Sequence, residues 1–442
     1  MFRLHDRTRR RIALAGFFAF CVVPTVLIAA WGTSRHLPWH LRAESRKLSR
    51  ELGLNVSLAA IRHLRPGVVL YEGLQLTDPE TGQGLFRCRL LEAGWRNPTG
   101  RQQHDRVSLV LIASQPEIEA AGLNELWQLL HRVFTRRAGS TEIDVRLVAG
   151  EVTLRADCDA QTFSDVQADI EWLADRTRAQ LHFRLAGVEM PETARIRIDR
   201  NRQTTAPTTR FELYTGGAAL PCPVLAAGLS GLKSLGPRGT FCGYLWAEQT
   251  LAGWEGEAAG HLNDIELDRL VTDRFPHKLG GTAQVTIRRA RFRRGRFEEA
   301  SGLVLAGPGT VSRSLLQASA ERLGLTRIAE PGTPGPVVPY DRLAFAFSID
   351  PRGLQLRGEC LADGAPAVLV DRAGPLLGEP VSPRPVVALL RTLVPANEVQ
   401  VPATRQTDWL ARWLPLPNVA PPSDTDPPLP HARVRLGRDV RE

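Results

Sequence analysis

The residues that could do chemistry are spread through this 442-residue chain without the spacing that catalysis requires. The motifs HExxH, GxGxxG and GxxxxGK[ST], typical of metalloproteases, dinucleotide-binding folds and phosphate-binding loops, do not occur in the sequence. The nearest approach to a nucleophile elbow, around Ser230, lacks the second glycine, so we interpret Ser230 as part of a helix end. The ten histidines occur singly. The sequence therefore predicts a protein that is not an enzyme and holds no cofactor and no metal, with an anchored hydrolase as a third alternative.

The cysteines show no pattern of a redox or metal site either. They are Cys21, Cys88, Cys158, Cys222, Cys242 and Cys360. None forms a CxxC pair, and no histidine lies at zinc-ligand spacing from any of them. Two interpretations stay open for Cys222 and Cys242: they form a disulfide in an oxidising compartment, or both are buried free thiols.

Positive charge is the main bias of the composition, with 56 Lys+Arg against 47 Asp+Glu and a net charge of +9. The arginines are not gathered into a stripe interleaved with aromatic residues, so the sequence predicts no nucleic-acid partner. The densest run, RRARFRRGRFEEA, predicts a hairpin that turns at Gly295 with its arginines on a wet face. The alternative is a contact with phosphates of lipid headgroups or lipopolysaccharide. The candidate contact residues are Arg288, Arg289, Arg291, Arg293, Arg294 and Arg296.

One segment has the length and composition of a membrane span. The 21 residues from Ile12 to Gly32, IALAGFFAFCVVPTVLIAAWG, carry no charge. As a helix they would be roughly 31 Å long, about one hydrocarbon thickness. A cleaved signal peptide has a shorter apolar core and a small-x-small cleavage site, so the sequence favours an uncleaved signal anchor. Pro24 would kink this helix, and Trp31 suits a position in the aromatic belt at the interface.

The flanking charge predicts the orientation of this anchor. Arg9, Arg10 and Arg11 precede the apolar segment at the end of a short N-terminal tail, and positive charge stays on the cytoplasmic side. We therefore expect a single-pass protein of the inner (cytoplasmic) membrane, with a cytoplasmic N-terminus and the bulk of the chain in the periplasm.

The rest of the chain reads mainly as antiparallel β-structure with one wet face. Apolar and polar residues alternate in many short runs, and TEIDVRLVAGEVTLRAD, residues 141–157, predicts a hairpin that turns at Ala149-Gly150. Helices are few and short. They are predicted over residues 41–52, 123–133, 221–232, 312–323 and 385–393.

These patterns divide the chain into successive parts. We predict a cytoplasmic tail (1–11), the transmembrane anchor (12–32), a short amphipathic helix (33–53), a first β-rich part (54–220), a second β-rich part (221–400) and a Pro-rich, flexible tail (401–442). Within that tail, Trp409 and Trp413 lie four residues apart beside leucines. They predict either a terminal helix that caps the sheet or an interfacial contact with the membrane.

The start of the chain resembles a known family of envelope proteins. A basic N-terminus, one anchor and a short helix lead into LSRELGLNVSLAAIRHLRPGVVLYEGLQLTDPETGQGLFRCRLLEA, an order that looks like the start of AsmA-like proteins, which include the TamB type. The matching residues are Leu48, Leu52, Gly53, Val56, Pro66, Gly67, Val68, Leu70, Gly73, Leu74, Leu76, Asp78 and Gly82. Two later stretches, GGTAQVTIRRARFRRGRFEEASGLVLAGPGTVSRSLLQA and FSIDPRGLQLRGEC, resemble the closing strands of that family.

The resemblance implies an elongated, curved sheet with an apolar inner face, anchored in the inner membrane. It implies a role in envelope maintenance, holding or transferring lipid along an apolar β-groove, with phospholipid and other envelope proteins as candidate partners. Exposing a 16-carbon acyl chain to water costs roughly 12 kcal/mol at ~0.8 kcal/mol per CH₂, so an apolar groove would favour transfer. The same alternation also fits a filled sandwich core. The alternative function is therefore an anchored structural or interaction scaffold without a ligand.

Overall fold

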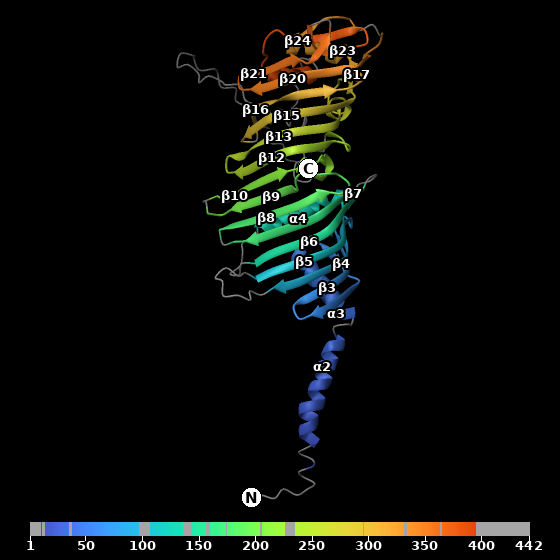
Figure 1. Cartoon of the computed structure of the whole chain (residues 1–442), viewed down its shortest axis with the longest axis vertical. Helices are drawn as coiled ribbons and strands as arrows, with labels where there is room; N and C mark the ends of the chain where they lie inside the picture. The colour runs from blue at the N-terminus through green and yellow to red at the C-terminus, as the bar shows by residue number, and fades with distance from the viewer. Residues whose placement is uncertain are drawn as a thin grey trace, which may run out of the picture.

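The structure, a computed structural model, describes Arg10 and residues 14–34, 38–96, 107–135, 143–155, 160–173, 175–203, 206–225, 235–294, 296–330, 334–362 and 365–394. The fold is mainly β, as predicted, and its main feature is one long curved sheet with helices at its N-terminal end (Figure 1). Within the described ranges this sheet contains 21 strands, and a second sheet contains three.

The strands of the long sheet follow one another along the chain. In the first half they are β1 Asn55–Ser57, β2 Ala60–Arg65, β3 Val68–Thr77, β4 Gly84–Arg96, β5 Val107–Glu119, β6 Ile143–Arg155, β7 Ala160–Trp172, β8 Arg176–Leu185, β9 Ala194–Asn201 and β10 Thr208–Tyr214. In the second half they are β11 Leu220–Pro221, β12 Thr240–Thr250, β13 Gly253–Glu266, β15 Thr282–Arg293, β16 Arg296–Ala306, β18 Leu325–Arg327, β20 Arg342–Asp350, β21 Gly353–Gly358, β22 Cys360–Ala362, β23 Ala365–Asp371 and β24 Gly374–Pro380.

Pairing proceeds almost in chain order. Strands β1 and β2 both pair with β3, and the ladder continues through β4 to β10, then β12, β13, β15, β16 and β20. The prediction of a wholly antiparallel sheet is wrong at one place, because β5 and β6 are parallel. Helix α4 (Leu123–Thr135) joins these two strands, and this crossover returns the chain to the same end of the sheet. The sheet is therefore mixed.

The predicted hairpin at Ala149-Gly150 is also wrong. Strand β6 runs through both residues and keeps one register with β7 on either side of them. The buried side chains change from odd to even positions along β6: Ala149 is buried before the break, and Val152 and Leu154 are buried after it. The neighbouring strands are irregular at the same level, where Gln115 has a φ of 51° and Asp165 a φ of 52°. A crease, that is, a local irregularity at the same level of adjacent strands, therefore interrupts the alternation of apolar and polar residues in the same way as a turn.

Two short helices lie outside the predicted segments: η2 Ala120–Gly122 and η4 Asp268–Thr272. The other helices of the described ranges fall within or overlap predicted segments: η1 Phe18–Val22, α2 Val23–Ser34, α3 Pro38–Leu52, α5 Cys222–Leu225, α6 Arg313–Ala318, η5 Ser319–Leu323 and α7 Val387–Leu393. Within the described part of the chain, no single helix combines the length and the apolar composition needed to cross a membrane. The Pro-rich tail predicted over residues 401–442 lies outside the described residues.

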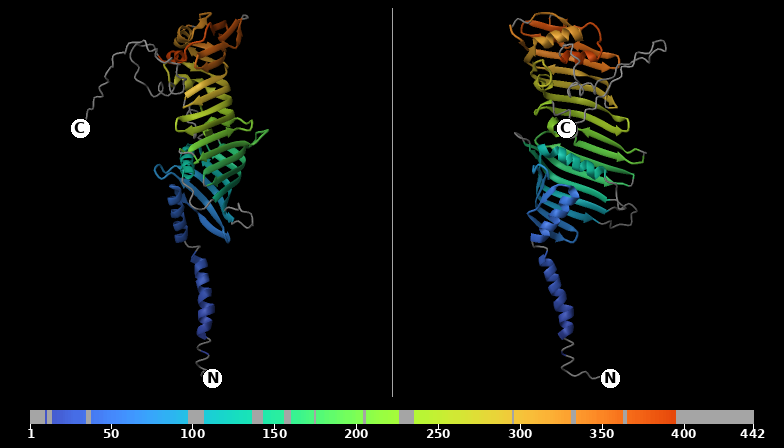
Figure 2. Two further views of the ribbon diagram at one scale, coloured as in Figure 1. Left: turned by 90° about the vertical axis from the view of Figure 1, so that its left-hand side faces the viewer. Right: turned by 180° about the vertical axis from the view of Figure 1, so that it is seen from behind.

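Two apolar core clusters lie along the sheet. The first joins strands β1 to β12 with the apolar side chains of α3 and α4, among them Leu48, Leu52 and Leu126. The second joins strands β13 to β24 with α6, η5, α7 and the small sheet of β14 Leu279–Gly280, β17 Gly309–Ser312 and β19 Val337–Tyr340. Figure 2 shows α3 and α4 on one face of the sheet, which we call the inner face, and the opposite face we call the outer face.

Candidate functional site

Alternation along the strands separates the two faces of the sheet. In β10, Phe211 and Leu213 lie on the inner face, where the Phe211 ring meets the Trp127 ring of α4 edge to face at 6.1 Å. Arg210 and Glu212 lie on the outer face and form an ion pair at 2.8 Å. The amphipathic pattern of the sequence therefore gives an apolar inner face and a charged outer face.

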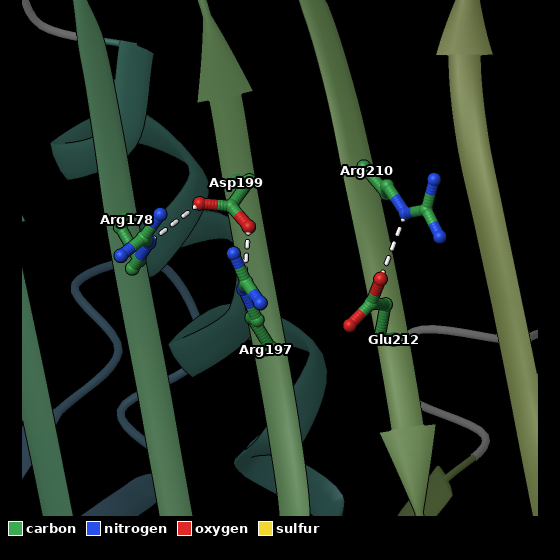
Figure 3. A network of polar contacts seen from close by, with 5 residues as sticks. All are labelled: Arg178, Arg197, Asp199, Arg210 and Glu212. Atoms are coloured by element: carbon green, nitrogen blue, oxygen red, sulfur yellow. Dashed lines mark hydrogen bonds and ion pairs between the residues drawn. The ribbon is translucent and has the colours of Figure 1, made fainter.

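The outer face carries a ladder of ion pairs (Figure 3). The Asp199 carboxylate accepts from Arg178 Nε at 2.9 Å and from Arg197 Nε at 2.6 Å. The hydrogen bond to Asp199 raises the pKa of Arg178 above its ordinary value. The Arg210 guanidinium also lies 4.7 Å from the centroid of the Trp246 ring. Each of these partly exposed ion pairs contributes only about 0–1 kcal/mol to stability, but together they keep the outer face polar and hydrated.

The arginine-rich run forms the predicted hairpin of β15 and β16. Three of its arginines pair with glutamates of the outer face: Arg289 with Glu257 and Glu299, Arg291 with Glu257, and Arg293 with Glu255 and Glu298. Of the other candidates, Arg288 and Arg294 are exposed and Arg296 is half-buried. The glutamates thus offset part of the charge that the sequence concentrates here.

A cavity of about 870 Å³ lies on the inner face beside α4. Its apolar walls include Trp127 and Phe134 of α4, Ile198 of β9, Phe211 of β10 and Trp254 of β13. The end of α3 and the loop between β3 and β4 close its other sides. Ligand pockets in proteins commonly measure about 300–1,000 Å³ and are mostly apolar with a few polar groups, as this one is.

Two polar atoms in the wall of this cavity are buried without a hydrogen-bond partner among the described residues. They are Oε2 of Glu125, on α4, and Nε of Arg200, on β9. Arg200 also donates from Nη1 to Thr209 Oγ1 at 2.8 Å, which holds its guanidinium against the sheet. An unsatisfied buried polar atom costs about 1–3 kcal/mol, and both of these atoms are almost completely covered by other protein atoms.

Helix α4 is fixed over the sheet at its C-terminal end by Arg202. Its guanidinium donates to Phe134 O at 2.9 Å and to Thr177 Oγ1 at 2.8 Å. Thr177 is fully buried, so the pair of bonds connects the helix end to the interior of β8. A cation here also complements the negative end of the helix dipole.

Beyond α4 the inner face stays apolar along the sheet. One register row consists of Ile196, Leu213, Leu245, Ala258, Ala290, Ala300, Ile349 and Leu354. It crosses eight strands, and with a spacing of about 4.8 Å its seven steps measure roughly 34 Å. Near the hairpin tips, Phe292 and Phe297 lie edge to face at 6.4 Å and belong to neither core cluster.

Glycines make room for aromatic rings on this face. A Cβ on Gly256 would lie 2.6 Å from the Phe292 ring, and one on Gly302 would lie 2.9 Å from the Phe347 ring. Both rings therefore pack against the glycine of the neighbouring strand. The row joins the two cores, because Leu213 belongs to the first cluster and Leu354 to the second.

The cysteines of the described residues are free thiols, so Cys222 fits the alternative of a buried free thiol, whereas Cys242 is a free thiol that is only half-buried. Cys88, Cys222 and Cys360 are buried. Burial raises the pKa of Cys222 to about 11. The described residues contain no group of three or more His, Cys, Asp or Glu side chains that could hold a metal ion.

The predicted anchor residues fall only partly within the structure. Arg10 and Pro24 are described in helical segments, as is the backbone of Trp31. Arg9, Arg11, Trp409 and Trp413 lie outside the described residues.

The polar residues of the cavity, Glu125 and Arg200, are not among the predicted site residues, although the alternation pattern of the sequence marks Arg200. Arg200 falls on the same parity as Ile196 and Ile198, so a charged residue stands where the pattern calls for an apolar one. Glu125 carries no such signal, because its position over β9 depends on the crossover of α4.

No known protein family, curated protein or solved structure matches this chain.

Proposed function

We propose that this protein is an inner-membrane-anchored, periplasmic protein of AsmA-like type that holds or transfers phospholipid acyl chains along the inner face of its sheet. The observation that carries the proposal is the continuous apolar row of roughly 34 Å that passes the cavity beside α4. One acyl chain spans about half of a hydrocarbon core of ~30 Å. The row as a whole exceeds this length, and its ends at Leu213 and Leu354 are covered by the two core clusters.

The polar atoms of the cavity suit the other end of a lipid. Arg200 lines the cavity, and its guanidinium can donate to a phosphate or ester oxygen. Aromatic walls at Trp127, Phe211 and Trp254 would contact the first methylenes of the chain. The charged outer face has no comparable apolar row, so the proposal assigns the lipid to the inner face alone.

The proposed anchor is supported by the apolar side chains on the N-terminal helical segments. Seven of them are exposed: Leu14, Phe17, Phe18, Phe20, Val23, Val26 and Leu27. Exposed apolar side chains around a helix are costly in water and favourable in lipid. They support a membrane-embedded segment that leads into α3.

Photocrosslinking in cells tests the lipid-holding proposal with matched controls. A benzophenone amino acid replaces Phe211 or Phe292, on the inner face, or the adjacent Glu212 or Arg291, on the outer face. Because neighbouring residues of a strand point to opposite faces, each pair differs in direction and hardly in position. After irradiation, the full-length protein is purified and the mass of its crosslinked peptides is measured.

Phospholipid adducts at residues 211 and 292 but not at residues 212 and 291 would support lipid on the inner face. Equal labelling of both faces, or no lipid adduct at any of the four positions, would refute it. Thermal melting of each variant shows whether it folds like the parent, so that a failed variant is not counted.

A second candidate function rests on how much of the inner face is already covered. Helices α3 and α4 pack on its N-terminal half, and α6, α7 and the small sheet pack on the C-terminal half. Such filling favours an anchored scaffold that binds another envelope protein. In that case the same crosslinker would yield protein adducts and no lipid adducts.

A further inference from the structure

The end of the sheet nearest α2 carries exposed apolar side chains. Trp39, in the first turn of α3, is 56% exposed, Leu64 of β2 is 54% exposed, and Trp95 of β4 is 51% exposed. Water-exposed tryptophan is unusual on a protein in which most apolar side chains face a core. We call these three residues the base.

Contacts between α3, β2 and β4 place the three base residues at one end of the sheet. The His40 ring, next to Trp39, lies 6.2 Å from the ring of His63, which precedes Leu64. The hairpin then turns at Gly67, whose carbonyl accepts from Trp95 N at 2.9 Å. All three side chains therefore belong to one end of the sheet.

This end is also where the N-terminal helix meets the sheet. Helix α2 ends at Ser34 and α3 begins at Pro38, so three residues lie between them and the two helix ends are at most about 14 Å apart. Figures 1 and 2 show α2 leading away from the sheet at the same end as α3 and β3. The base thus surrounds the point from which the apolar helix departs.

Helix α3 is held firmly to this end of the sheet. The Ser45 hydroxyl donates to Val56 O, and Val56 N donates to Ser49 Oγ at 2.9 Å. Leu41, Leu48 and Leu52 pack on the first core cluster. The base residues on α3, β2 and β4 therefore keep a fixed arrangement relative to one another.

We infer that the base is a membrane-docking surface whose partner is the headgroup region of the bilayer from which α2 emerges. This inference rests on the anchor of the proposed function. Tryptophan rings favour the interface between headgroups and acyl chains, and Leu64 would enter the apolar side of it. Arg42 and Arg65, both exposed beside the base, complement anionic lipid phosphates.

Docking of the base would set the sheet directly on the bilayer surface. Strands β1 and β2 form the edge of the sheet there, and α3 covers the edge of β1 through the hydrogen bonds of Ser45 and Ser49 to Val56. The first inner-face strands then begin at the lipid surface. An acyl chain could pass from the bilayer to the inner face without crossing bulk water.

Site-directed fluorescence on the full chain in lipid vesicles tests this inference. Cys21, Cys158 and Cys242 are replaced by serine, a cysteine replaces Leu64, and an NBD label is attached to it. The vesicles contain phosphatidylcholine and phosphatidylglycerol at about three to one, with or without a lipid spin-labelled near the headgroup. Control labels occupy positions 251 and 361, whose leucines are each 89% exposed and lie on later strands or turns.

We expect the label at position 64 to emit at shorter wavelength than both controls and to be quenched at least twofold by the spin-labelled lipid. Emission and quenching equal to those at position 251 would overturn the inference. A blue-shifted label that the spin-labelled lipid does not quench would also overturn it, because a protein would then cover the base. Melting curves that match the parent verify that the labelled chains are folded.

Flotation of the vesicles separates this inference from the proposals on which it depends. A chain that does not float with the vesicles would refute the anchor and the base together. A chain that floats but leaves position 64 in water would refute the base alone. Lipid adducts at Phe211 are a separate measurement, so the acyl-chain proposal can fail while the base is confirmed.

Discussion

Replacing Arg202 with methionine should loosen the C-terminal end of α4 while keeping most of the side chain's apolar contact. The change removes two hydrogen bonds, to Phe134 O at 2.9 Å and to Thr177 Oγ1 at 2.8 Å. A hydrogen bond to a charged group contributes about 1.5–3 kcal/mol. Because Arg202 is only half-buried and water can partly replace it, we expect a total loss of about 2–3 kcal/mol.

Hydrogen exchange of the α4 peptide, measured by mass spectrometry on the full chain, reports the free energy of opening this helix directly. At 1.4 kcal/mol for each factor of ten, the loss corresponds to exchange roughly 30- to 140-fold faster. The Thr177→Val variant removes one of the two bonds and should accelerate exchange less. In the double variant the two effects should not add, because both act on the same bond.

The matched control is Arg178→Met on the outer face. Arg178 makes an ion pair of similar length with Asp199, but that pair lies on the wet side of the sheet and should leave α4 exchange unchanged. Equal acceleration by both methionine variants would refute the argument, since it would show that loss of charge matters and not the link to α4. Full additivity of the Arg202 and Thr177 changes would refute it as well.

Four further outcomes follow from the same structure. Burial lowers the pKa of His277 below 6.5. The unfolded chain therefore binds more protons than the folded chain in acid, and the free energy of unfolding should fall as the pH drops below about 6.5. In His277→Gln the melting temperature should fall less over that pH range. Gly302→Val should cost about 1–3 kcal/mol because its side chain would collide with the Phe347 ring, whereas Gly150→Val, which has open space around it, should be nearly neutral in urea unfolding. At pH 8 about one Cys222 thiol in a thousand is a thiolate, so iodoacetamide should modify Cys222 only after unfolding, and a linked Cys222–Cys242 peptide in mass spectrometry would contradict the free thiols. Arg200→Gln should lower the yield of lipid adducts at position 211 several-fold, whereas Arg197→Gln on the outer face should leave that yield unchanged.

Much of the fold can be predicted from local patterns, because one face of the sheet is wet. Apolar and charged residues alternate strictly in runs such as Arg195 to Ile198, and the predicted helix over residues 123–133 matches α4. The strands of the arginine-rich run also pair as the predicted hairpin. Each of these features depends on residues within one or two elements.

The errors arise where the structure depends on distant residues. The break in alternation at Ala149-Gly150 is the same for a turn and for a crease, and only pairing with β5 and β7 decides between them. The parallel pairing of β5 and β6 depends on where α4 packs. The cavity needs Glu125 and Arg200 to meet across this crossover, which no local pattern encodes.

The nearly sequential pairing of the strands has a consequence for how the chain folds. Each new strand finds its partner in the strand made just before it, so most loops that must close are short and their entropic cost is small. Under the proposed topology, a chain exported with its N-terminus held in the membrane would add hairpins one after another onto the end already folded. The step from β16 to β20, across residues 307–341, is one exception. The step from β5 to β6 is another, because α4 must cross the sheet before β6 can pair. We expect this step to limit the rate at which the first half of the sheet forms.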